Sequence, residues 1–145
     1  MSISDGMSAA TIGSDTGGST RAPAVFCGIV GLKPTTTRMP SDGIYPLSTS
    51  FDAAGPMGHS TDCCAVMDDI MAGGAGRAET PFPVAGLRLA IPRGYLFDEL
   101  DTEVAAGFEA AVARLSAAGA AISDISLDIL EAVSYTHLRA HETSP

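Results

Sequence analysis

A glycine-rich segment near the start of the chain holds the residues whose types and spacing best suit chemistry. Residues 13–21 read Gly-Ser-Asp-Thr-Gly-Gly-Ser-Thr-Arg, between a short apolar run and a stretch with helical character. Paired glycines let the backbone approach a ligand closely, and consecutive N–H groups beside a helix N-terminus bind anions or oxyanions. Ser19, near the end of the turn, is therefore a candidate nucleophile with an oxyanion site beside it. A turn with no chemical role is the alternative, because glycine and serine loops are common.

Few residues could activate Ser19. A Ser-His-Asp arrangement would have to use His59, because the other two histidines lie in an atypical stretch, residues 134–145. His59 directly precedes an expected helix, where a surface or capping role is the alternative. Lys33 is the only lysine, and its place in a turn before a proline favours a solvated or ion-paired side chain. The residues alone thus provide a nucleophile without a convincing base.

Other catalytic and binding templates do not match. The segment around Ser19 is not Gly-x-Ser-x-Gly, since Arg21 occupies the last position. The run Gly28–Lys33 lacks the Gly-Lys-Ser/Thr of a phosphate-binding loop, and no Gly-x-Gly-x-x-Gly is present. His59 has no cysteine or histidine at a metal-ligand spacing. We therefore expect neither a cofactor nor a metal.

The elements that must position the turn are short. We expect a strand over residues 9–12 that runs into the turn, and a helix over residues 21–27 with its proline in the first turn. An apolar run over residues 29–32, stopped by Lys-Pro, predicts a second strand. Residues 34–58 are rich in glycine and proline and are expected to form turns.

The second half of the chain has clearer periodicity. Thr61 is the expected cap of a helix that ends at Gly73, and a second helix is expected over residues 101–118, closed by a glycine. The apolar positions that define these helices are Cys63, Val66, Met67, Ile70, Met71, Val104, Phe108, Val112 and Leu115. Strands are expected over residues 87–91 and 122–127, after a linker from Gly73 to Gly86. Strand, helix and strand in this order predict an α/β fold with a mixed, mainly parallel sheet flanked by helices.

Length and composition exclude several classes of protein. The 145 residues suffice for one modest domain, and the 17 acidic residues outnumber the 8 basic ones to give a net charge of −9. Such a charge argues against a nucleic-acid partner, and no apolar run is long enough for a membrane helix. The start of the chain has no features of a signal peptide. With only three cysteines and no metal spacing, we expect reduced thiols and a cytoplasmic location. Homo-oligomerisation is left open.

The end of the chain differs from the rest in composition. Residues 134–145 hold two histidines and no apolar period, and they resemble translated adapter sequence, with a natural disordered terminus as the alternative. We expect residues 1–132 to be the folded part and residues 133–145 to be a non-native or disordered tail.

Three segments resemble one family of enzymes. The run over residues 13–35, GSDTGGSTRAPAVFCGIVGLKPT, is similar to the core motif of the amidase signature family, serine hydrolases that cleave carboxamides. The likeness continues over residues 50–73, with an Asp-x-x-Gly-Pro-Met stretch before a helix, and through the strand and helix that follow residue 86. The resemblance covers about residues 4 to 130 and implies the amidase signature fold.

The resemblance assigns roles within the glycine-rich turn. The family uses a Ser-Ser-Lys triad, and its nucleophile corresponds to Ser19. The backbone N–H groups of the family's oxyanion hole correspond to those of Thr16, Gly17 and Gly18, together with that of Ser19. Asp15 and Arg21 also match family positions, as a buried pair that would support the turn.

The remaining members of the triad have no counterpart in these 145 residues. The family's second serine and its lysine lie upstream of the nucleophile, whereas only 18 residues precede Ser19. The resemblance therefore implies an interior fragment of a longer catalytic domain, inactive by itself.

The implied activity is hydrolysis of a small-molecule amide to the acid and ammonia through a serine acyl-enzyme. The A component of glutamyl-tRNA amidotransferase, which belongs to the same family, is an alternative. The run TTTRMPSDGIYPLSTSFDAAGP over residues 35–56 favours a free-standing amidase. A non-catalytic binding domain derived from this fold is a third interpretation, of another functional class.

Overall fold

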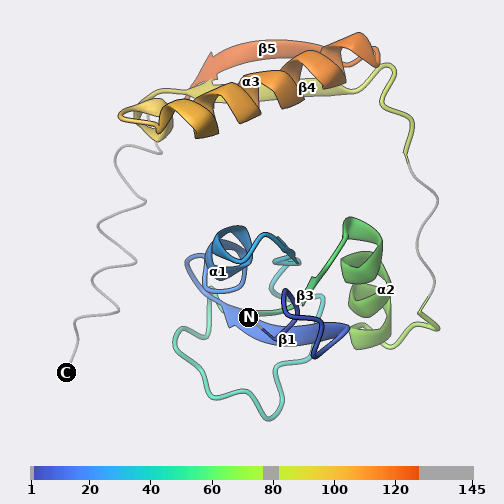
Figure 1. The fold of residues 1–145 in the computed structure, drawn as a ribbon. Helices are drawn as coiled ribbons and strands as arrows, with labels where there is room; N and C mark the ends of the chain where they lie inside the picture. Colours follow the sequence, from blue (N-terminus) through green and yellow to red (C-terminus); the bar gives the residue numbers. More distant parts are fainter. Residues whose placement is uncertain (1, 77–81, 128–145) are drawn as a thin grey trace. The chain divides into compact units, whose positions relative to one another are not determined.

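The computed structural model describes residues 2–76 and 82–127, which belong to two compact units, Met1–Thr80 and Pro81–Pro145 (Figure 1). The elements of the first unit are β1 (Ala10–Asp15), α1 (Arg21–Phe26), β2 (Val30–Gly31), β3 (Ala53–Gly58) and α2 (Thr61–Met71). Those of the second are β4 (Arg88–Arg93), the 3₁₀ turn η1 (Tyr95–Phe97), α3 (Thr102–Ala117) and β5 (Ala121–Ser126).

The first unit is built on a three-stranded sheet in the order β1-β3-β2. Both pairs are antiparallel: Asp15 is paired with Ala53 on one side of β3, and Val30 with Gly58 on the other. Strand β3 is buried over most of its length, and α2 packs against it (Figure 1). The glycine-rich turn leaves the sheet at the end of β1, beside the start of β3.

Strand β3 is absent from the sequence prediction, which assigned only turns to residues 34–58. Its glycines and its proline are typical of turns, and for this reason the strand was not predicted. Close packing explains the glycine at position 55. A Cβ atom on Gly55 would lie 2.0 Å from the carbonyl oxygen of Leu32. The same backbone comes close enough for the Leu32 N–H to donate to the carbonyl of Pro56 at 3.0 Å. Only a small residue fits between these two segments.

The expectation of a mainly parallel sheet is wrong for the first unit. The helix α1 crosses from β1 to β2, and because both strands are antiparallel to β3, they run in the same direction as each other. From the sequence we predicted a strand, a helix and a strand over these residues, without a pairing between the two strands. The sequence did not indicate that β3 would lie between them and make both described pairs antiparallel.

The second unit has the predicted strand–helix–strand order with parallel pairing. Leu89 of β4 is paired with Ile122 of β5, and α3, whose N-cap is Asp101, lies along this sheet (Figure 1). Gly119 takes a φ of +94° after the end of α3, as expected for a glycine that ends a helix. The α/β class is thus established, with the parallel pair in this unit.

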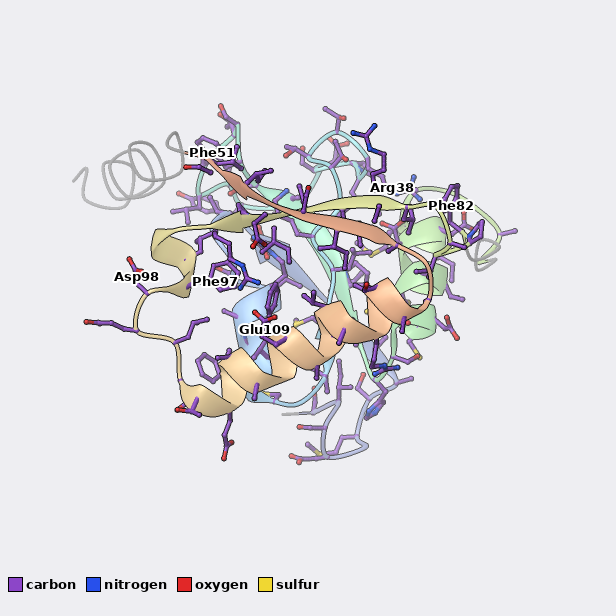
Figure 2. All side chains as sticks on the ribbon, turned by 90° about the horizontal axis from the view of Figure 1, so that it is seen from above. Arg38, Phe51, Phe82, Phe97, Asp98 and Glu109 are labelled. Atoms are coloured by element: carbon purple, nitrogen blue, oxygen red, sulfur yellow. The ribbon has the colours of Figure 1, made fainter. Side chains whose placement is uncertain are left out.

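Side chains at one end of the second unit tie its elements together. Arg93, at the end of β4, donates to Glu109 of α3 at 2.8 Å and to Asp124 of β5 at 3.2 Å. Its guanidinium also lies 4.8 Å from the ring centre of Phe97, which meets Phe108 edge-on at 5.1 Å. Figure 2 labels Phe97 and Glu109 where η1 faces α3.

The ends of α2 test the prediction for that helix. Its N-cap is Ser60, whose side chain accepts from the Cys63 N–H at 3.2 Å, so the prediction of Thr61 as the cap is wrong by one residue. The helix ends before Gly73, which has a φ of +87°. Within α2 the buried residue is Cys64, which lies outside the predicted apolar positions.

Two further expectations concern the chain as a whole. In the part of the chain that the structure describes, no helix is both long and apolar enough to cross a membrane. The predicted tail and the boundary at residues 132/133 lie outside the described residues.

Candidate active site

The glycine-rich turn joins β1 to α1 over residues 16–20. Gly18 adopts a φ of +136°, a conformation that side chains rarely allow, and this bends the chain toward the helix. Ser19 follows it and is exposed, while its neighbour Thr20 is buried. The structure thus presents the candidate nucleophile to solvent on a turn between a strand and a helix.

A single buried carboxylate, that of Asp15 at the end of β1, binds the end of the turn that enters α1. Asp15 has no exposed surface and accepts hydrogen bonds from the backbone N–H groups of Gly18 at 2.8 Å, Thr20 at 3.2 Å and Arg21 at 3.3 Å. The Arg21 side chain adds a two-pronged contact, with Nε 3.0 Å and Nη2 3.1 Å from the two carboxylate oxygens. These contacts link the last residue of β1 to the first residue of α1.

The pKa of Asp15 reflects two opposed effects. Burial by itself raises the pKa of this carboxyl, because it disfavours the charged form. The hydrogen bond from Arg21, the backbone N–H groups of Thr20 and Arg21 and the positive charge of Arg21 outweigh burial, so the pKa lies below its ordinary value of 3.8. Asp15 is therefore ionised at neutral pH and is held in the turn as an anion.

The contact between Gly18 and Asp15 bears on the oxyanion site. The Gly18 N–H donates to Asp15 at 2.8 Å, so this group already has a strong acceptor. It has less to offer a developing oxyanion than an N–H group without such a partner. The backbone N–H groups of Thr16 and Gly17, which were also predicted to form the oxyanion site, do not donate to Asp15.

A second carboxylate contacts the other end of the turn and was not identified from the sequence as part of the site. The Thr16 hydroxyl donates to Asp52 Oδ1, and Asp52 Oδ2 accepts from the N–H groups of Leu47 at 2.8 Å and Ser48 at 2.9 Å. The bond from Thr16 is the main reason that the pKa of Asp52 is lowered, with help from Ser48 and Leu47. The only signal in the sequence is the Asp-x-x-Gly-Pro stretch, which gives no indication of the partner.

A cavity of about 220 Å³ lies beside Asp52. Its walls come from the ends of β1 and β3 and from the loop between β2 and β3. The lining residues are Ser14, Thr36, Met39, Ser41, Ile44, Pro46, Thr49, Asp52 and Ala54. Asp52 thus belongs both to the wall of the cavity and to the support of the turn.

Lys33 and His59 are the two residues of this chain that were considered as a base for Ser19. Lys33 donates from Nζ to the carbonyl of Pro34, its neighbour in sequence, at 3.1 Å. His59 is exposed between β3 and α2. The Lys33 contact thus does not involve the turn that carries Ser19. Among the residues that the structure describes, no group of three histidine, cysteine or acidic side chains is placed to hold a metal ion.

Comparison with known proteins gives enzymes of one family. The profile of the family described as Amidase matches residues 1–140. The chain is 38% identical over 142 residues to the A component of glutamyl-tRNA(Gln) amidotransferase of Marinomonas sp. MWYL1, covering 89% of this chain and 29% of that protein. It is 37% identical over 120 residues to indoleacetamide hydrolase of Agrobacterium vitis, covering 83% of this chain and 26% of that protein.

Solved structures of the same kind share the fold. The A component of glutamyl-tRNA(Gln) amidotransferase from Thermotoga maritima matches with a TM-score of 0.83 and 28% identity, over 97% of this chain and 34% of that one. Native peptide amidase from Stenotrophomonas maltophilia matches with a TM-score of 0.74 and 28% identity, over 87% of this chain and 29% of that one. The chain spans about a quarter to a third of the length of these relatives. Because the family profile extends over nearly all of its residues, the chain belongs to the Amidase family.

Proposed function

We propose that this chain supplies the nucleophile of an enzyme that hydrolyses a carboxylic acid amide through a serine acyl-enzyme. The observation that carries the proposal is the exposed Ser19 at the end of a turn that the buried carboxylate of Asp15 holds between β1 and α1. Membership of the Amidase family supports the same reaction class.

In the proposed reaction, Ser19 Oγ attacks the amide carbon, and its proton passes to a base. The negative charge that develops on the amide oxygen is stabilised by backbone N–H groups of the turn. Of the groups named from the sequence, those of Thr16 and Gly17 are favoured over that of Gly18, which donates to Asp15. The base then gives this proton to the amide nitrogen, the C–N bond breaks and ammonia leaves, and water hydrolyses the acyl-enzyme to the acid and free Ser19. The reaction needs no cofactor.

The base is a separate part of the proposal. Lys33 bonds to its neighbouring carbonyl and His59 lies in solvent, so neither is the acceptor that we propose. The resemblance of the turn to the amidase signature motif points to a lysine that acts through a second serine. Both would come from the part of the full-length protein that precedes this segment.

Replacement of Ser19 tests the proposal. In the full-length protein that carries this segment, we expect Ser19→Ala to lower the turnover of small amides by about 10⁴-fold or more, as for other serine triads. A fluorophosphonate should label the wild type at Ser19 and leave the variant unlabelled. The fold should be unchanged, because one exposed oxygen is removed.

The matched control is His59→Ala, which we expect to leave turnover within about twofold of wild type, since no proton passes through this residue. Activity that survives in Ser19→Ala and is lost in His59→Ala would contradict the assignment of the nucleophile. A full-length wild type without activity on any amide, and without labelling, would favour the non-catalytic binding domain.

A second candidate function is the glutamine amidase step of a tRNA amidotransferase. The supporting observation is that the chain is as similar to the A component of an amidotransferase, at 38% identity, as to indoleacetamide hydrolase, at 37%. The sequence of residues 35–56 still leads us to propose the free-standing amidase first.

The two candidates are separated by their substrates and partners. The full-length protein alone should release ammonia from simple carboxamides if it is a free-standing amidase. If it is part of an amidotransferase, the release of ammonia from glutamine should depend on the other components of that complex, with misacylated tRNA as the acceptor. Hydrolysis only in that second mixture would replace our first proposal by the second.

A further inference from the structure

The turn that carries Ser19 is held by a different carboxylate at each end. Asp15 binds the backbone of Gly18, Thr20 and Arg21, on the side of the turn that enters α1. None of these contacts involves Thr16, the first residue after β1. The side chain of Thr16 instead donates from its hydroxyl to Asp52.

The position of Asp52 follows from the register of the sheet. Asp15 is paired with Ala53, so the residue after Asp15 and the residue before Ala53 face each other where the ladder of β1 and β3 ends. This is the point at which the chain leaves the sheet to form the turn. Thr16 and Asp52 thus continue the strand pairing by one step, with side chains in place of backbone.

Asp52 is itself held in place. Its Oδ2 atom accepts from the N–H groups of Leu47 at 2.8 Å and Ser48 at 2.9 Å, and this leaves Oδ1 for Thr16. A carboxylate with three donors has little freedom to rotate. It therefore provides a fixed acceptor for the Thr16 hydroxyl.

The same carboxylate joins the turn to the nearby cavity. Ser14, Asp52 and Ala54 line the cavity of about 220 Å³, and its other lining residues come from the loop to which Asp52 is bonded through Leu47 and Ser48. Loss of Asp52 would release the beginning of the turn and this part of the loop together.

We propose that Asp52 is a positioning residue, which fixes the Thr16 peptide of the nucleophile turn through the Thr16 hydroxyl. This inference rests on the proposed function, since it assigns the backbone of Thr16 to the oxyanion site. Asp52 takes no proton and touches no substrate in this role. Its effect is on the direction of a backbone N–H group, and small errors in such directions lower catalytic rates strongly.

The test uses four variants of the full-length protein that carries this segment. Thr16→Val removes the hydroxyl and keeps the shape and the backbone N–H, and Asp52→Asn weakens the acceptor. Both should lower kcat for amide hydrolysis by about 10-fold to 100-fold with little change in KM, because an oxyanion contact forms only in the transition state. Thr16→Ser, which keeps the hydroxyl, should have a kcat within about threefold of that of wild type. Ser19→Ala is measured beside them.

Matched controls remove the same groups elsewhere in the first unit. Thr11→Val acts on a half-buried threonine of β1, and Asp42→Asn acts on an exposed acid of the loop. Both should retain the kcat of wild type. Circular dichroism gives the folded fraction, to which every kcat is normalised.

The outcomes separate this inference from the proposed function. If Ser19→Ala abolishes activity while folded Thr16→Val keeps the kcat of wild type, the positioning role is wrong and the nucleophile stands. If Ser19→Ala remains active, the proposed function itself is wrong. Should Asp52→Asn fail to fold, Thr16→Val decides alone, because it leaves the bonds of Asp52 to Leu47 and Ser48 intact. A fall in melting temperature with unchanged kcat in Thr16→Val would show a purely structural role and overturn the proposal.

Discussion

At the scale of single residues, the candidate site depends on two carboxylates that do no chemistry of their own. Asp15 is buried and ionised, and it accepts hydrogen bonds from the backbone N–H groups of Gly18 and Thr20. Asp52 fixes the other end of the turn through Thr16. Together these bonds hold the turn, with its exposed Ser19, at both ends.

The buried carboxylate makes stability depend on pH. Because the pKa of Asp15 is lower in the folded protein than its ordinary value of 3.8, ionised Asp15 stabilises the fold above that value. This stabilisation is lost as the pH falls through the lower, folded pKa. We expect Asp15→Asn to lower the free energy of unfolding by about 3 kcal/mol at pH 7, and by progressively less below pH 3.8.

Urea unfolding of the full-length protein at a series of pH values measures this effect. Asp5→Asn, which changes an exposed acid of the same unit, is the control and should follow wild type at every pH. If the free energy of unfolding had the same dependence on pH in wild type and Asp15→Asn down to pH 2, the assignment of Asp15 as a stabilising anion would be contradicted.

At the scale of elements, caps and close approaches decide where helices and strands begin. Helix α2 starts from the side chain of Ser60, and β3 fits beside Leu32 only because residue 55 has no Cβ atom. Neighbouring residues of the same chemical type can therefore differ in role, as Ser60 and Thr61 do.

The cap of α2 gives a direct comparison between two adjacent hydroxyls. Ser60→Ala removes the acceptor of the Cys63 N–H and should lower the free energy of unfolding by about 1 kcal/mol. Thr61→Ala, at an exposed residue inside the helix, should have an effect of less than about 0.5 kcal/mol. Urea denaturation of both variants measures the difference. An equal or larger loss of stability in Thr61→Ala would indicate that Thr61 is the N-cap.

At the scale of the whole molecule, each unit leaves large apolar side chains uncovered. Val25 and Phe26 of α1 are 75% and 90% exposed, and Tyr45 of the loop is 96% exposed. In the second unit, a groove of about 410 Å³ between β4, η1 and α3 is lined by apolar residues that include Ile91 and Leu96. Apolar surface of this extent is typical of a face that other parts of a protein cover.

We therefore expect the isolated 145-residue chain to expose apolar surface in solution. It should bind the dye 1-anilinonaphthalene-8-sulfonate with increased fluorescence and should aggregate as its concentration rises. The full-length protein is the control and should bind much less dye at the same molar concentration. A soluble monomer with a sharp cooperative melt and no dye fluorescence would show that these faces need no cover.

The sequence by itself determined the features of this protein that depend on local patterns. The strand, turn and helix around Ser19 could be predicted because glycine pairs, a proline in a first helical turn and a short apolar run act over a few residues. The parallel pair of the second unit could be predicted for the same reason, since a periodic helix between two apolar strands favours a crossover. The resemblance to the family motif then supplied the proposed role of Ser19, which its neighbours alone left open.

Tertiary structure alone decided which distant residues meet at the turn. Asp52 lies 36 residues from Thr16 in the chain, and their contact depends on the antiparallel register of β1 and β3. That register could not be predicted while β3 itself was interpreted as turns. Its glycine at position 55 is required by the nearby backbone of Leu32, which the sequence of β3 does not reveal. Local sequence patterns determine which helix, strand or turn a segment can form. Contacts between distant segments determine which of these structures is adopted and which side chains support the site.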